Sequence, residues 1–200
     1  MPDLPELDRQ LAGAAERFGT PAYVYSADTV AARLAHLRDH FGRWFAVSFA
    51  VKSNPNPGLL DWMRGRLDYL DISSGGELAL ARQAGWDPGR ISFTGPAKRA
   101  PELRAAIGGG LGELVLESLR EARLADAIAA ELGVIQPVLI RIAPDRVPKG
   151  FGDQMAGRPS PFGIDVEDAA AILPQIAALP NLRIIGLHIY SGTQSLKPDA

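Results

Sequence analysis

The chain of 200 residues contains no cysteine. This stretch therefore cannot form a disulfide, bind a metal through thiolates or use a thiol nucleophile, and the absence is typical of proteins in a reducing compartment. Acidic and basic residues nearly balance, with a net charge of −2. The overall basic charge with which many proteins attract nucleic-acid phosphates is thus also missing.

Long apolar segments are absent as well. No run approaches the roughly 18–20 consecutive apolar residues of a membrane helix, and residues 1–19 have neither the basic start nor the apolar centre of a signal peptide. We therefore expect a cytoplasmic protein that interacts with neither nucleic acid nor membrane. Hydrophobic residues (46%) and charged residues (22%) occur in the proportions of an ordinary globular domain.

Short apolar runs recur along the chain and are separated by segments typical of helices. The runs that we predict to be buried strands are 45–51, 67–72, 91–94, 114–116, 138–142 and 184–190. Measured from Phe45, Tyr69, Ile91, Leu114 and Val138, the first five strands begin 22 to 24 residues apart. Such regularity indicates repeated β/α units in a parallel sheet. The predicted fold class is α/β, a TIM (β/α)8 barrel, with a doubly wound sheet as the alternative.

Helix signals occupy the intervals between these strands. Ser74–Glu77 and Ser118–Glu121 have the spacing of capping boxes, and Asp165 is expected to cap a helix over 166–178. Six strands are two fewer than a barrel needs, so we expect the remaining strands to follow residue 200. The interval between the last two predicted strands contains a glycine- and proline-rich stretch, Pro144–Pro161, which is a candidate active-site loop.

Polar residues follow the predicted strands at their C-terminal ends, which converge at the mouth of a parallel barrel. The clearest is Lys52, directly after the first apolar run. A partly desolvated lysine has a lowered pKa and becomes a nucleophile toward carbonyl groups, although a solvated lysine at a strand end fits the position too. Arg141 interrupts the apolar sequence VLIRIAP and needs an anionic or polar partner, either a carboxylate such as Glu117 or Asp71 or a ligand.

The last predicted strand carries two aromatic side chains on one face. His188 and Tyr190 are two residues apart, so both can stack on a planar cofactor or move protons, or both can belong to the core. Ser191, Gly192 and Thr193 follow them and can bind a phosphate or form an ordinary turn.

Six sequences occur in an order that resembles a known family. They are AVKSNPNPGLL, LDISSGGELALARQAG, ISFTGPAK, VLIRIAP, SPFGID and GLHIYSGTQ. From about Thr20 onward, the chain resembles the fold-type III pyridoxal-phosphate-dependent decarboxylases, the family of diaminopimelate and ornithine decarboxylases. The resemblance implies that residues 31–200 form part of a cofactor-binding (β/α)8 barrel. It also implies that residues 1–30 supply a strand, at 22–26, to a C-terminal β-domain.

The resemblance implies pyridoxal 5'-phosphate (PLP) as the cofactor and Lys52 as the residue that forms its internal aldimine. Arg141 matches an arginine near the phenolic oxygen of the cofactor. Asp71 and Glu77 match acidic residues of the motif on the second strand. The loss of carbon dioxide from the substrate would place electrons in the cofactor ring.

The final motif departs from the common pattern. In relatives the motif is typically HIGS, with its histidine against the cofactor ring and its serine near the phosphate. Tyr190 and Thr193 hold the corresponding positions here, and His188 matches an earlier histidine of diaminopimelate decarboxylases. We therefore expect Tyr190 to stack on the ring and Thr193 to lie near the phosphate.

The substrate implied by the resemblance is an amino acid, either free or bound to an acyl-carrier protein. The stretches SGTQ and GRPSPFGID look most like a subgroup of butirosin-type and exosortase-associated decarboxylases. Pro161 stands where many family members have lysine, which argues against a plain diaminopimelate decarboxylase. A homodimer is expected. The alternatives are a diaminopimelate decarboxylase of lysine biosynthesis, an alanine-racemase-type enzyme and a non-catalytic PLP-binding barrel.

Overall fold

A computed structural model of the chain describes residues 4–146, 153–154, 157, 160–190 and 192–193. The chain divides into two compact units, Met1–Val47 and Ser48–Ala200. The first contains helices α1 (Leu4–Phe18) and α2 (Ala27–Phe41). Residues 22–26 between them have no regular secondary structure. Their expected role as a strand of a second domain stays a prediction.

The second unit is built on a parallel sheet. Its main strands are β1 (Ser48–Ala50), β2 (Tyr69–Ile72), β3 (Ile91–Phe93), β4 (Glu113–Leu116), β5 (Gln136–Ala143) and β8 (Leu182–Ile189). They pair in this order, and every pair is parallel. A short strand, β7 (Ile164–Asp165), pairs with the C-terminal end of β5. Each of the six predicted strands is present, although the first is shorter than predicted, and the α/β class is confirmed.

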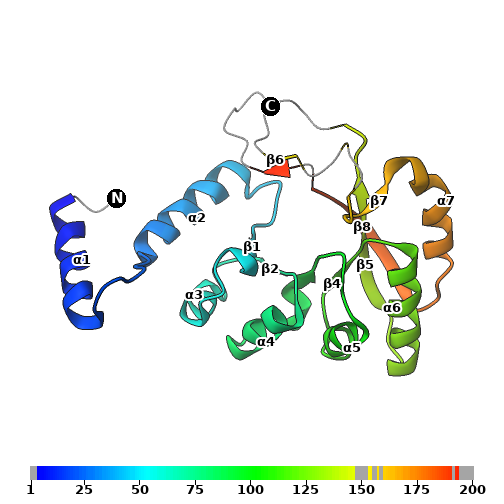
Figure 1. Ribbon diagram of the computed structural model, residues 1–200, viewed down its shortest axis with the longest axis horizontal. Coiled ribbons are helices and arrows are strands. Elements are labelled where there is room, and N and C mark those ends of the chain that lie inside the picture. The colour runs from blue at the N-terminus through cyan, green and yellow to red at the C-terminus, as the bar shows by residue number, and fades with distance from the viewer. Residues whose placement is uncertain (1–3, 147–152, 155–156, 158–159, 191, 194–200) are drawn as a thin grey trace. The chain divides into compact units, whose positions relative to one another are not determined.

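Five helices connect these strands and lie in an arc outside them (Figure 1). They are α3 (Pro57–Met63), α4 (Gly75–Gln83), α5 (Ala100–Gly108), α6 (Leu119–Leu132) and α7 (Val166–Ala177). Two single-turn 3-10 helices, η1 (Val51–Ser53) and η2 (Pro88–Arg90), precede α3 and β3. The strands β6 (Asp153–Gln154) and β9 (Gly192–Thr193) form a separate antiparallel pair. Within the described residues, no helix is long and apolar enough to cross a membrane.

Side chains along the strands alternate between the apolar core and the opposite face of the sheet. In β2, Leu70 and Ile72 are fully buried, and Asp71 between them points to the opposite face of the sheet. Burial of each such aliphatic side chain contributes about 1.5–3 kcal/mol. Leu60 and Leu103, from α3 and α5, are also fully buried. The core between the sheet and the helices therefore fixes the strands from one side and leaves the other face for polar residues.

The first predicted strand is partly wrong. Its apolar run begins at Phe45, but β1 begins at Ser48, whose partner in the sheet is Tyr69, the first residue of β2. The strand is thus shorter than the apolar run, and Phe45 is 65% exposed. At the other end the chain leaves the strand after Ala50 and turns through η1. Lys52 consequently lies on a tight turn rather than at the last position of a strand.

The hydrogen bonds at the helix caps agree only in part with the predicted capping boxes. The hydroxyl of Ser74 accepts from the N–H of Glu77, as predicted, but the Glu77 carboxylate accepts from the N–H of Ser73, the residue before the cap. The cap that begins at Ser118 repeats both bonds. Asp165 stands at the N-cap position of α7, as predicted, but its side chain forms no capping hydrogen bond with the helix.

Candidate functional site

A cavity of about 560 Å³ opens at the C-terminal ends of the strands of the second unit. Its volume falls within the range of small-molecule and cofactor sites, roughly 300–1,000 Å³. All six residues selected from the sequence line it: Lys52, Asp71, Arg141, His188, Tyr190 and Thr193. Ala50, Ser73, Phe93, Thr94, Gly95, Pro96, Ala97, Lys98, Glu102 and Phe162 complete the lining. The six residues thus line one cavity, and their roles as site residues stay predictions.

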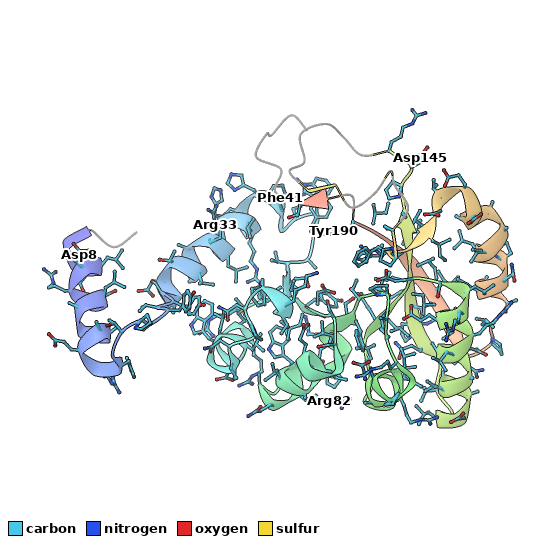
Figure 2. The ribbon with its side chains drawn as sticks, in the orientation of Figure 1. Asp8, Arg33, Phe41, Arg82, Asp145 and Tyr190 are labelled. Carbon is cyan, nitrogen blue, oxygen red and sulfur yellow. The ribbon has the colours of Figure 1, made fainter. Side chains whose placement is uncertain are left out.

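The sheet brings distant parts of the chain together in this cavity. Arg141 on β5 and His188 on β8 are register partners, so their side chains come from adjacent positions. Tyr190, labelled in Figure 2, follows β8 directly. Ser191 and most of the candidate loop Pro144–Pro161 lie outside the described residues.

Lys52 reaches the cavity from η1. The residue is exposed, so the partial desolvation expected from the sequence is not observed. Its amine forms no hydrogen bond or ion pair with any residue in the described part of the chain. Within that part, a ligand can approach the amine without displacing a partner.

Asp71 is half-buried in the cavity wall. Burial raises the pKa of its carboxyl, while the hydrogen bond from Thr94 and the positive charge of Lys52 act in the opposite direction. The Thr94 hydroxyl donates to Oδ1 of Asp71. This bond joins β2 to the end of β3 at the cavity.

Arg141 has the anionic partner predicted from its apolar surroundings. Its Nη1 donates to Oε1 of Glu117 at 3.0 Å, and the two side chains are 7% and 2% exposed. The guanidinium carbon also lies 4.7 Å from the centre of the Phe162 ring and 5.9 Å from that of Tyr190. These distances are typical of cation–π contacts, so the plane of the guanidinium is fixed from several sides.

His188 carries an unsatisfied polar atom. Its Nδ1 is buried and has no hydrogen-bond partner, the one such side-chain atom in the described part of the chain. Burial lowers the pKa of His188, and the positive charge of Arg141 lowers it further. The unpaired Nδ1 is therefore available to a ligand group, because a buried polar atom without a partner costs about 1–3 kcal/mol.

Lys98 also lines the cavity, although its position in the sequence does not indicate a site residue. Its Nζ donates to the carbonyls of Gly95 and Val115 at 2.5 and 2.7 Å and to Oε1 of Glu121 at 2.8 Å. The side chain is 1% exposed. A lysine after a Gly-Pro pair looks like a solvated loop residue, so the local sequence carries no signal of this burial. The two lysines of the cavity differ, since the amine of Lys98 has three acceptors.

Comparison with known proteins places this geometry in a family. Residues 27–199 match the profile described as "Pyridoxal-dependent decarboxylase, pyridoxal binding domain". The chain is 33% identical over 194 residues to the L-glutamyl-[BtrI acyl-carrier protein] decarboxylase of Niallia circulans, covering 96% of this chain and 45% of the relative. It is 36% identical over 186 residues to the diaminopimelate decarboxylase of Pseudomonas aeruginosa, covering 92% and 45%.

Solved structures agree with these relatives. Diaminopimelate decarboxylase from M. jannaschii, in complex with L-lysine, superposes with a TM-score of 0.84 at 28% identity, over 92% of this chain and 45% of that one. A mutant of SrLDC in complex with PLP superposes with a TM-score of 0.80 at 27% identity, over 96% and 47%. The chain thus spans about half the length of the relatives that it matches. It belongs to the pyridoxal-dependent decarboxylase family and contains the barrel domain that this family uses to bind pyridoxal.

Proposed function

We propose that the chain is the PLP-binding barrel of an amino-acid decarboxylase, and that Lys52 attaches the cofactor. The observation that carries the proposal is the contrast between the two lysines of the cavity. Lys98 is fully hydrogen-bonded, whereas Lys52 is exposed to the cavity with its amine unpaired within the described residues. Only an amine with an accessible lone pair can attack an aldehyde.

The other residues of the cavity fit the chemistry of PLP. Arg141 supplies cationic N–H donors for an oxygen of the cofactor, and Tyr190 supplies an aromatic face for its ring. Thr193 supplies a hydroxyl for the phosphate, as the resemblance implies. His188, with its unpaired Nδ1, gives a second ring and a second polar contact.

When bound, PLP acts as an electron sink that allows the carboxylate of an amino acid to leave as carbon dioxide. The residues of this chain hold and orient it. Lys52 would provide the amine to which the aldehyde of the cofactor attaches. Asp71, whose pKa is raised by burial, lies in the same cavity as Lys52 and is close enough to interact with it electrostatically.

For the substrate we propose an amino acid that is free or bound to a carrier protein. The Niallia circulans relative is named for a glutamyl group on an acyl-carrier protein, and the Pseudomonas aeruginosa relative for diaminopimelate. Pro161 and the GRPSPFGID stretch favour the carrier-linked class over diaminopimelate. A homodimer, as the resemblance implies, remains part of this proposal.

The decisive experiment is reductive labelling. The protein is incubated with PLP, reduced with borohydride and digested, and the labelled peptide is identified by mass spectrometry. We expect the label on Lys52 and not on Lys98, and no label on the Lys52→Ala variant. A label that persists in Lys52→Ala contradicts the assignment. Carbon dioxide release is then measured with free and carrier-bound amino acids; labelling without any release supports the non-catalytic PLP-binding alternative.

A further inference from the structure

The carboxylate of Glu117 connects three segments of the cavity wall. Its Oε1 accepts from the N–H of Gly95 at 2.8 Å and from Nη1 of Arg141 at 3.0 Å, and its Oε2 accepts from the N–H of Gly163 at 3.0 Å. Gly95 follows β3, Arg141 lies on β5, and Gly163 precedes β7. Glu117 itself does not line the cavity.

The burial of the Glu117 carboxylate carries a cost in lost hydration. The Glu117 side chain is 2% exposed, and an ionised carboxylate at such a site is retained only when charge and hydrogen bonds compensate its lost hydration. Arg141 supplies the opposite charge. The guanidinium has five donors, of which one bonds to Glu117 and none to another residue of the described chain. Since Arg141 lines the cavity, its other donors can serve a ligand there.

The two glycines permit the backbone to approach Glu117. Gly95 and Gly163 have φ angles of +117° and +79°, which other residues rarely adopt. A Cβ on Gly163 would lie 3.1 Å from the Arg141 side chain. Thr94, the residue before Gly95, donates its hydroxyl to Asp71. The Glu117–Gly95 bond therefore also fixes the segment that holds the Asp71 carboxyl.

A second layer fixes Glu117 in turn. The backbone N–H of Glu117 donates to Oε2 of Glu121 at 2.8 Å, and Oε1 of Glu121 accepts from buried Lys98 at 2.8 Å. Lys98 also donates to the carbonyl of Gly95. The loop after β3 is thus held at its N–H by Glu117 and at its carbonyl by Lys98.

We propose that Glu117 is a positioning residue of the cofactor site: its buried carboxylate orients the guanidinium of Arg141 and, through Gly95, the Thr94–Asp71 pair. Glu117 does this without contacting the cofactor. The inference rests on the proposed function, because the ligand that Arg141 meets is taken to be PLP.

The test is a double-mutant cycle on PLP affinity. Dissociation constants are measured by absorbance titration for the wild-type protein, E117Q, R141M and the double variant E117Q/R141M. Hydrogen bonds to charged groups contribute about 1.5–3 kcal/mol, so we expect E117Q to weaken PLP binding roughly ten- to hundredfold. In the R141M background the same change should weaken binding less than about threefold, because Glu117 then has no guanidinium to orient.

Controls separate positioning from folding. L116A removes a fully buried side chain next to Glu117; it should lower the thermal midpoint and leave PLP affinity and the absorbance maximum of the bound cofactor unchanged. If E117Q does not fold, E117D replaces it in the cycle, because Asp keeps the charge but is too short to reach all three donors. E117D should then weaken binding in the wild-type background only.

Two results overturn the inference. One is wild-type affinity in the Glu117 variants, and the other is an equal loss in both backgrounds. Borohydride labelling of Lys52 in the wild-type protein distinguishes the two proposals: if Lys52 is not labelled, the proposed function has failed. If Lys52 is labelled and the Glu117 effect does not depend on Arg141, only the positioning role has failed.

Discussion

Glu102 joins the N-terminal ends of two helices beside the cavity. Its Oε1 accepts from the N–H of Gly75, the first residue of α4, at 2.9 Å. Its Oε2 accepts from the side chain of Arg99 at 2.9 Å and from the N–H of Arg99, which caps α5, at 3.1 Å. These hydrogen bonds lower the pKa of Glu102 to about 2, and the bond from the Arg99 side chain has the largest effect, ahead of that from the N–H of Gly75. Glu102→Gln removes the charge and one acceptor oxygen, so it should destabilise the fold.

The loss of stability in Glu102→Gln depends on how exposed the partners of Glu102 are. The Glu102 side chain is 17% exposed, but that of Arg99 is 80% exposed, so the ion pair itself is screened by water and contributes at most about 1 kcal/mol. The hydrogen bonds from backbone N–H groups to a charged acceptor contribute more. We therefore expect Glu102→Gln to lower the free energy of unfolding by about 1–2 kcal/mol near pH 7.

The pH dependence of that loss has a definite sign. The pKa of Glu102 in the folded chain, about 2, lies below the value of about 4.3 for an unfolded glutamate. Its stabilising contribution is thus present above about pH 4.3 and is lost as the pH falls toward 2. The difference between the wild-type protein and the variant should accordingly shrink between about pH 5 and pH 3.

Urea unfolding of both proteins across this range measures the difference directly. The matched control is Glu131→Gln, which removes an exposed ion pair with Arg104 whose side chains are 59% and 49% exposed. We expect it to cost less than about 0.5 kcal/mol. A Glu102→Gln deficit that is absent near pH 7, or that stays constant down to about pH 3, would refute the reasoning.

Two further predictions concern the cavity wall. Lys98→Met should cost about 3–5 kcal/mol in urea unfolding, because it leaves the buried charge of Glu121 without its partner; K98M/E121Q should cost less than the sum of the single changes, and simple additivity would contradict the buried pair. Tyr190→Ala should weaken PLP binding about tenfold if Tyr190 stacks on the ring, while Tyr190→Phe keeps the affinity. Loss of binding in His188→Ala, with Tyr190→Ala unaffected, would assign the stacking ring to His188 instead.

The order of the sheet was predictable because each strand of this fold is encoded locally. A short apolar run and a helix signal repeat at nearly constant spacing. Parallel β/α units have only one common hand of connection. Strand ends were less predictable. The run from Phe45 to Val51 has one polar residue, Ser48, yet β1 spans only Ser48–Ala50, and the run itself does not mark these bounds.

The direction of the strands was enough to predict where some of the site residues lie. Parallel strands deliver the residues at their C-terminal ends to one mouth, and the cavity confirms this for Asp71 and Arg141. The supporting contacts were not predictable. Glu117 bonds to Gly163, 46 positions away, and neither residue has a local feature that indicates the other. Its pairing with Arg141, by contrast, follows from the need of a buried guanidinium for an anion.

The two cavity lysines show why partners, rather than position, decide the chemistry. Both follow short strands and both line the same cavity. Three acceptors surround Nζ of Lys98, including the Glu121 carboxylate at 2.8 Å. The donors of this amine are thereby occupied by the protein itself. Lys52 lacks such acceptors among the described residues, so its amine stays open to a ligand in the cavity. Under the proposed function, the partners of Lys98 therefore leave Lys52 as the cavity lysine, among the described residues, whose amine is open to a carbonyl group.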